Sequence, residues 1–150
     1  CSRRQVAGVY RGECREKGLE FESGKHTLRL RIDEPSLAKE FGDVVLWRKD
    51  GGPAYQWVSV IDDLEAKVNL IVRGEDLRSS SELQKHISRL VAPGGLDSVR
   101  FLHHPLLTDD QGKKLAKSEG ASSILDLRKA GATPAELRES LGALIRSWGF

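Results

Sequence analysis

The feature that most constrains the fold is the alternation, after residue 55, of short apolar runs with amphipathic stretches. Residues 69–72 and 99–102 are short apolar runs between polar flanks, which is typical of buried strands. Residues 83–91, which lie between these runs, carry apolar side chains at helical spacing. Strands that alternate with helices form open α/β sheets whose functional loops follow the strand ends, so we predict an α/β fold.

Capping patterns mark two helix starts in this part of the chain. Ser79 and Glu82 have the spacing of a capping box just ahead of the first helical stretch. Thr133, Pro134 and Glu136 predict the start of a C-terminal helix, with the threonine as cap and the proline at the first helical position. The apolar stripe of that helix is formed by Leu137, Leu141, Leu144, Ile145 and Trp148.

The segment that precedes the alternating part is predicted to be rich in strands. Residues 27–32 alternate with period two, which predicts a half-buried strand that ends at Pro35. Residues 44–48, 50–53 and 55–61 have the composition of a strand, a hairpin turn and a second strand.

The composition is that of a globular protein without extreme charge. A chain of 150 residues with 39% hydrophobic and 31% charged residues can bury a core within one domain. The net charge of +2 allows a polyanionic partner only through local clusters of basic residues. No run approaches the ~18 apolar residues of a membrane span, and no charged-then-apolar leader opens the chain. We therefore expect a cytoplasmic protein with no membrane partner.

A glycine-led polar loop at residues 112–118 carries Lys114 and Lys117, three positions apart. A lysine ammonium is a compact charge on a flexible stem, so this loop could hold two charges against a polyphosphate. A lysine-rich loop can equally be solvated surface, and the residues alone leave both interpretations open.

Tyr55 and Arg73 are candidates for a carboxylate-binding cleft, because each is expected at the edge of an apolar run. Arginine offers a planar fork of donors that matches a carboxylate, and tyrosine adds a hydroxyl on a rigid ring. Ser59, two pleats beyond Tyr55 in the expected strand, is a weaker candidate for the same pocket. In the alternative interpretation Tyr55 packs against the core and Arg73 pairs with an acidic neighbour.

Cys1 and Cys14 are the cysteines of the chain. In a cytoplasmic protein two cysteines are more often buried thiols or metal ligands than a disulfide. Structural zinc needs a tetrahedral set of four ligands, which two thiolates alone do not supply.

Several segments together resemble the second half of the catalytic domain of class I glutamyl-tRNA synthetases. The segments that carry the resemblance are residues 72–77, Ser80, Ser81, Gln84, residues 104–106 and residues 114–118. In that family the last segment is the KMSKS motif, and Ala116 stands here where the family usually has serine.

The resemblance implies a role for each candidate residue. Lys117 would contact ATP, Lys114 would assist it, and the Ser118 hydroxyl would donate to phosphate. His104, just after a predicted strand, could line the ATP cleft, although a structural role for this histidine is equally open. Tyr55 and Arg73, with Ser59 as the weaker member, would bind glutamate.

A second resemblance concerns the start of the chain. Tyr10 and Cys14 with the following arginine resemble the Tyr-x-x-x-Cys-Arg part of the zinc motif in glutamyl-queuosine tRNA(Asp) synthetases. Cys1 is similar to the second cysteine of the Cys-x-Cys pair that supplies the other zinc ligands. The resemblance thus implies an incomplete zinc site made by Cys1, Tyr10 and Cys14.

The family implies an architecture of three segments. Residues 1–54 would form a zinc-motif-like, β-rich connecting segment, residues 55–123 the second half of a Rossmann-like nucleotide-binding fold, and residues 124–150 a C-terminal helical stretch. The first half of that fold, which carries the HIGH motif, has no counterpart here. We expect the isolated chain to be inactive or nearly so, and the missing half to be a possible partner.

The function implied is ATP-dependent activation of glutamate and its transfer to tRNA, with the queuosine of tRNA-Asp as the favoured acceptor. Stopping soon after the KMSKS-like loop fits the shorter glutamyl-queuosine enzymes. The alternative is a non-catalytic synthetase-like module that binds tRNA or a partner protein.

Overall fold

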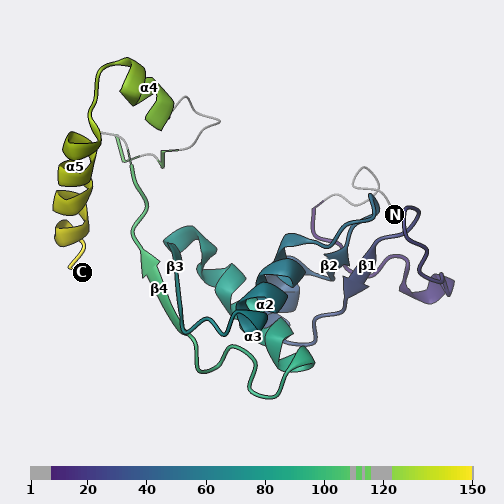
Figure 1. Cartoon of the computed structure of the whole chain (residues 1–150). Helices are drawn as coiled ribbons and strands as arrows, with labels where there is room; N and C mark the ends of the chain where they lie inside the picture. Colours follow the sequence, from purple (N-terminus) through teal and green to yellow (C-terminus); the bar gives the residue numbers. More distant parts are fainter. Residues whose placement is uncertain (1–7, 109–110, 113, 116–122, 150) are drawn as a thin grey trace. The chain divides into compact units, whose positions relative to one another are not determined.

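The computed structural model describes residues 8–108, 111–112, 114–115 and 123–149. The chain divides into two compact units. The first comprises Cys1–Ile71 and Leu77–Leu102, and the second comprises Val72–Asp76 and His103–Phe150. The elements, in chain order (Figure 1), are η1 (Arg15–Lys17), β1 (Leu28–Leu30), α1 (Pro35–Phe41), β2 (Val44–Trp47), α2 (Tyr55–Glu65), β3 (Leu70–Gly74), η2 (Glu75–Leu77), α3 (Arg78–Val91), β4 (Arg100–His104), α4 (Ile124–Lys129) and α5 (Pro134–Ser147).

The first predicted strands are confirmed as β1 and β2, which pair antiparallel. Leu30 lies opposite Val44 and Arg29 opposite Val45, with an irregularity in the register between Leu28 and Arg29. The short helix α1 between the two strands was not predicted. The Glu34 side chain accepts hydrogen bonds from the first backbone N–H groups of α1, and Pro35 occupies a position where a helix needs no donor.

The strand predicted at residues 55–61 is wrong, because this segment begins helix α2. Trp57, Val60 and Leu64 recur at helical spacing and pack into the core. The turn before it does form, and it returns the chain so that Pro53 bridges to Trp47. The chain then enters a helix instead of extending the hairpin, because the helical period places these three side chains on the face that packs against the core.

Helix α3 confirms the helix predicted around residues 83–91 but starts earlier, at Arg78. The capping box predicted for Ser79 and Glu82 is wrong, because the chain runs from the 3-10 turn η2 directly into the helix with Leu77 at the cap position and no side-chain cap. Ser81, inside the helix, donates from Oγ to the carbonyl of Leu77 at 3.0 Å. The short strands predicted around residues 69–72 and 99–102 are confirmed as β3 and β4, which are neighbours in one sheet. Their predicted burial is wrong, because Ile71 is the one buried residue of the two strands and Val72 is exposed.

The core of the first unit lies between α2, α3 and the neighbouring strand β2 (Figure 1). Val60, Leu83 and Ile87 are fully enclosed, and Leu96 closes the core from the segment after α3. Burying an aliphatic side chain of this size contributes about 1.5–3 kcal/mol, so these residues anchor the unit.

The second unit contains two capped helices. Thr133 and Glu136 form the predicted capping box at the start of α5, with the Thr133 backbone N–H donating to Glu136 at 2.8 Å. Ser123 and Asp126 form a second box at α4 that the sequence analysis did not predict. Among the described residues, no helix has the length and apolar character needed to cross a membrane.

Candidate functional site

The candidate site in the second unit is centred on Lys114 and Asp76. The Lys114 ammonium donates to the Asp76 carboxylate, and this hydrogen bond holds the pKa of Asp76 below its usual range. Asp76 lies in η2, immediately after β3 ends. The polypeptide around Lys114 doubles back on itself, because Thr108 bridges to Lys114 and the Leu115 N–H donates to the Leu107 carbonyl at 2.8 Å.

Gly74 leaves the space in which the Asp76 carboxylate lies close to the backbone at the end of β3. A Cβ atom at Gly74 would lie 2.5 Å from Oδ1 of Asp76 and 3.1 Å from a methyl group of Leu106. A glycine at the end of β3 therefore lets the Asp76 carboxylate fold back against the strand end.

Lys117 and Ser118, the predicted ATP-contacting residues of the loop, lie outside the described residues. Of the predicted loop residues, Lys114 is the one whose side chain the structure places. Its position beside the motif at residues 72–77 brings together two segments that carry the family resemblance.

His104 ends β4 and stacks on Trp148, which follows α5. The ring centroids are 5.3 Å apart and the planes differ by 8°. Nδ1 of His104 lies 2.8 Å from the Pro105 carbonyl, a contact that requires a proton on Nδ1. Trp148 was predicted only as part of the apolar stripe of the last helix, and its contact with His104 was not predicted because the two residues are far apart in the chain.

The predicted glutamate-binding residues belong to different units. Tyr55 opens α2 in the first unit with a side chain that is 58% exposed, and Arg73 lies in β3 in the second unit. Ser59 is four residues after Tyr55, which places both on one face of α2. Tyr55 and Ser59 were expected on one face of a strand. They share a face of a helix instead, because residues four positions apart in a helix are neighbours.

A buried amide pair fixes the start of α2, where Tyr55 lies. Gln84 is fully buried in α3 and donates from Nε2 to Oε1 of Gln56 at 2.9 Å. The Gln56 amide nitrogen is 3.4 Å from the Ser80 hydroxyl. Gln84 and Ser80 carried part of the family resemblance, and their structural role is to tie α3 to α2.

The described residues give no support to the zinc prediction. The Tyr10 hydroxyl accepts a hydrogen bond from the Cys14 backbone N–H at 3.0 Å, so these two residues lie together. The expectation of a thiol or a metal ligand is wrong for Cys14, because its sulfur is in a disulfide bond. Cys1 lies outside the described residues. Within the described ranges, no three His, Cys, Asp or Glu side chains are grouped so that they could hold a metal ion.

Comparisons with known proteins agree on one family. Residues 5–147 match the family model of the class I tRNA synthetases (E and Q), catalytic domain. A glutamyl-Q tRNA(Asp) synthetase from Parasynechococcus marenigrum (strain WH8102) is 40% identical, over 87% of this chain and 45% of that protein. A glutamyl-Q tRNA(Asp) synthetase from Pseudomonas aeruginosa (strain LESB58) is 36% identical, over 99% of this chain and 59% of that protein. The chain therefore spans about half the length of the curated relatives it matches.

A solved structure supports the fold assignment. The crystal structure of a glutamate tRNA ligase from Elizabethkingia meningosepticum CCUG26117 in complex with its amino acid superposes with a TM-score of 0.51. Its sequence is 23% identical, and the match covers 78% of this chain and 28% of that one. The predicted α/β class is thereby confirmed. The chain belongs to the class I tRNA synthetases of the E and Q type, within their catalytic domain.

Proposed function

We propose that this chain supplies the KMSKS-bearing part of an enzyme that activates glutamate with ATP and transfers it to tRNA. The favoured acceptor is the queuosine of tRNA-Asp, as the names of the relatives indicate. The observation that carries the proposal is the ion pair of Lys114 with Asp76, which joins the KMSKS-like segment to the strand end that follows Arg73.

In the proposed reaction a carboxylate oxygen of glutamate attacks the α-phosphate of ATP, and pyrophosphate leaves. Negative charge grows on the phosphate oxygens as the bond to pyrophosphate breaks. Ammonium groups that meet this charge in the transition state lower the barrier. Lys114, whose side chain remains half exposed, would exchange Asp76 for phosphate, and Lys117 and Ser118 would contribute from the same loop.

The proposed glutamate site uses Arg73 as the carboxylate-binding fork, since a guanidinium can donate two parallel hydrogen bonds to one carboxylate. Tyr55 and Ser59, on one face of α2, would supply hydroxyl groups. His104 would face the nucleotide, with its ring orientation fixed by Trp148 and by Pro105.

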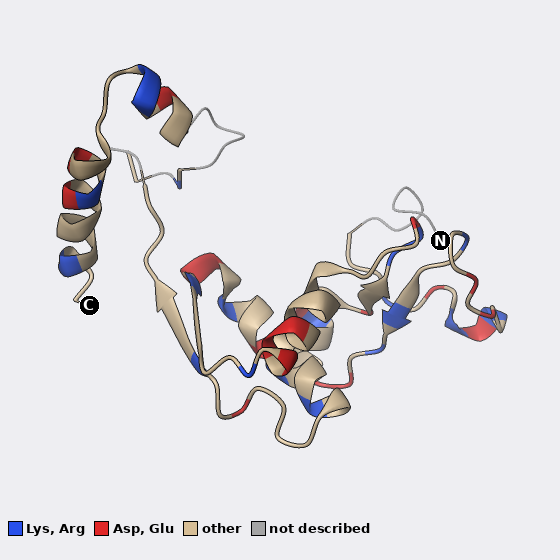
Figure 2. Ribbon diagram, viewed as in Figure 1, with Lys and Arg blue, Asp and Glu red and all other residues tan. Residues whose placement is uncertain are grey.

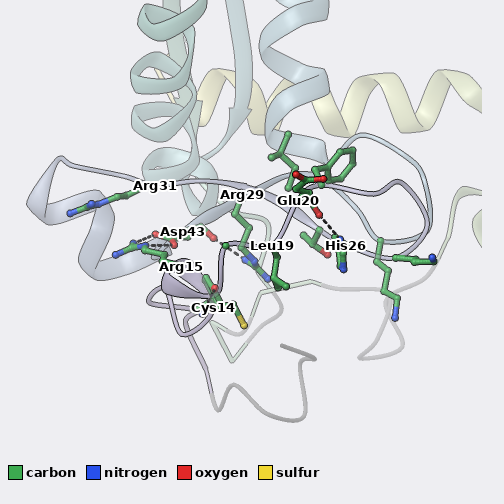
Figure 3. A pocket seen from close by; sticks show the side chains of 15 residues that line it. Cys14, Arg15, Leu19, Glu20, His26, Arg29, Arg31 and Asp43 are labelled. Atoms are coloured by element: carbon green, nitrogen blue, oxygen red, sulfur yellow. Dashed lines mark hydrogen bonds and ion pairs between the residues drawn. The ribbon is translucent and has the colours of Figure 1, made fainter.

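Activity is proposed for this chain together with the remainder of such an enzyme, because the chain spans about half of its relatives. In this proposal residues 1–54 would form the β-rich connecting segment, and residues 55–123 would carry the contacts to ATP and glutamate. Residues 124–150 would form the C-terminal helical stretch. The second candidate function, RNA binding without catalysis, is favoured by a basic cavity in the first unit, beside β1 and β2 (Figure 3). Sedimentation with and without tRNA, in the absence of ATP, measures that function directly.

Glutamate-dependent ATP–pyrophosphate exchange in the complete enzyme tests the catalytic proposal. Lys117→Ala should reduce the exchange rate by about 10²–10³-fold, the loss typical of one transition-state charge contact. Lys39→Ala provides the matched control, because Lys39 is an exposed lysine of α1. Equal exchange rates in the two variants would remove the loop from the mechanism.

A further inference from the structure

A histidine ends β4 in the second unit, next to the strand that leads into an acidic turn. His104 is the last residue of β4, and its ring stacks on Trp148, the residue that caps α5. In the sheet β4 is the neighbour of β3, and β3 runs into η2, which carries the acidic pair Glu75 and Asp76 (Figure 2). His104 thus has an aromatic ring on one side and belongs to the strand beside this turn.

The segment that follows β4 contacts both partners of the Lys114–Asp76 ion pair. Leu106 lies against the end of β3, because a Cβ atom at Gly74 would be 3.1 Å from its Cδ2 methyl group and 2.5 Å from Oδ1 of Asp76. Two residues further on, Thr108 bridges to Lys114. The ion pair therefore lies beside the residues that directly follow β4.

Asp76 is affected by two cationic groups. Lys114 donates a hydrogen bond to its carboxylate, and this bond is the main reason why the pKa of Asp76 is lowered. The charge of His104 lowers the pKa of Asp76 as well, by a smaller amount. His104 is thus close enough to act on the Asp76 carboxylate through its charge, while Lys114 holds the hydrogen bond.

The structure fixes which nitrogen of His104 can gain a proton. Nδ1 lies 2.8 Å from the Pro105 carbonyl, so Nδ1 carries the proton of the neutral ring. A second proton must then bind at Nε2, and the imidazolium that results can remain on the face of Trp148. An imidazolium at this place attracts the Asp76 carboxylate and repels the Lys114 ammonium, so both effects weaken the ion pair.

The elements around His104 carry other charged or titratable groups. They are Arg73 in β3, Glu75 in η2, Arg100 and His103 in β4, and Arg146 in the last turn of α5. His103 is the other imidazole of this group, so the experiment has to separate the two histidines.

We propose that His104 is a positioning residue that releases Lys114 from Asp76. When Nε2 takes up a proton from water, the imidazolium replaces the ammonium group as the cation beside the Asp76 carboxylate. The released ammonium group then turns to phosphate. This inference rests on the proposed function for the identity of that phosphate, which belongs to ATP. It adds a proton-controlled step to the place of His104 beside the nucleotide.

Side-chain nuclear magnetic resonance of the whole chain, without ATP, glutamate or tRNA, tests the release step. The signals of Lys114 Nζ and Asp76 Cγ are followed between pH 5 and 8, where imidazole is the ordinary side chain that changes its charge. The paired fraction of Lys114 should fall at the acid end, with the equilibrium shifted by up to about fivefold, as expected for an exposed ion pair. Signals that stay constant over this range in the parent would overturn the proposal.

Three variants identify the group that titrates. His104→Phe keeps a ring that can stack but cannot become a cation, so the pH dependence of the Lys114 signal should vanish. His26→Phe, which removes a histidine from the first unit, and His103→Gln are the matched controls and should titrate as the parent does. A pH dependence that persists in His104→Phe, or that is lost in His103→Gln instead, would overturn the proposal. Circular dichroism confirms folding of each variant.

Trp148→Leu tests whether the stack holds the histidine in place. Leucine is apolar but offers no aromatic face, so the pH-dependent shift of the Lys114 signal should be smaller than in the parent. Trp148→Phe keeps a ring and should retain the shift. An equal shift in Trp148→Leu and the parent would overturn the part of the proposal that concerns Trp148.

Pyrophosphate exchange in the complete enzyme connects the release step to ATP. The Michaelis constant for ATP in the parent should fall by up to about fivefold as the pH drops from 8 towards 6, relative to His104→Phe measured in the same buffers. The constant for glutamate should show no such difference between the two proteins. Equal pH dependence for ATP in both would overturn the role of His104 in ATP binding. The resonance titration contains no substrate, so absence of exchange in the parent would refute the proposed function and not the release step.

Discussion

Lys114 and Asp76 form an ion pair although 38 residues separate them in the chain. The pair holds the first lysine of the KMSKS-like segment against the turn that follows β3. In the proposed reaction the same ammonium group must reach phosphate, so Asp76 competes with ATP in the resting enzyme. Asp76 therefore restrains Lys114 in the resting enzyme.

Asp76→Asn should lower the Michaelis constant for ATP in the complete enzyme by up to about fivefold, because an exposed ion pair offers only weak competition. Asp62→Asn, which removes an exposed carboxylate from α2, is the control and should leave the constant unchanged. A higher Michaelis constant for ATP in Asp76→Asn would show that Asp76 orients the lysine for ATP instead of competing with it.

Gly74→Ala should have the same effect on the Lys114 ion pair through sterics. The added methyl group would lie 2.5 Å from Oδ1 of Asp76, so the carboxylate must shift, and this shift disturbs the hydrogen bond that Oδ2 accepts from Lys114. Gly142→Ala is the matched control, since Gly142 lies inside α5 and its Cβ would meet only the tip of Arg146 at 3.4 Å. The control should stabilise the chain by about 0.5–1 kcal/mol in thermal unfolding, as alanine is the better helix former. An unchanged nuclear magnetic resonance shift of the Lys114 side chain in Gly74→Ala would contradict the steric argument.

The elements that the sequence predicted well are those whose signals are local. The capping box of α5 lies within four consecutive residues, so Thr133 and Glu136 could be assigned without any tertiary information. Helix α2 was missed because a short run such as residues 55–61 fits both periods. What decides between them is the packing of Trp57 and Val60 against α3, which no local pattern contains.

In the candidate site, too, local sequence signals were predictive and contacts between distant segments were not. The motifs indicated which residue types matter, and the family supplied their roles. The partners of these residues come from distant segments, as with Asp76 for Lys114 and Trp148 for His104. The basic cavity was not predicted at all, because its cations are spread over the loop before β1 and both strand ends, without a run of charge in the sequence.

Stability should fall as the pH drops below about 4, the region where free carboxyl groups titrate. The pKa values of Glu136, Asp97 and Glu34 are held below their usual range, by hydrogen bonds from Thr133, Arg89 and the start of α1 respectively. Because the folded pKa values are the lower ones, the stabilisation is present above the unfolded pKa and is lost as the pH falls through the folded pKa. Chemical denaturation at several pH values measures this loss.

Glu136→Gln isolates one contribution to that pH dependence. The variant should be less stable than the parent near neutral pH, and the difference should shrink as the pH falls, because the parent loses the same interaction by protonation. Glu139→Gln is the control, since Glu139 is exposed and has no hydrogen bond or ion pair within the described ranges. A constant difference between parent and Glu136→Gln at all pH values would exclude the capping carboxylate as the titrating group.

Arg73→Lys tests the glutamate site. Lysine keeps the positive charge but loses the planar fork, so the variant should raise the Michaelis constant for glutamate by about tenfold and that for ATP far less. The contrast between the two substrates is the decisive measurement, because misfolding would impair both together. Ser59→Ala removes one half-buried hydroxyl from α2 and should raise the glutamate constant by a smaller factor. If the Michaelis constant for glutamate in Arg73→Lys stays within about twofold of the parent, a change under ~0.5 kcal/mol, Arg73 has a structural role and the carboxylate is bound elsewhere.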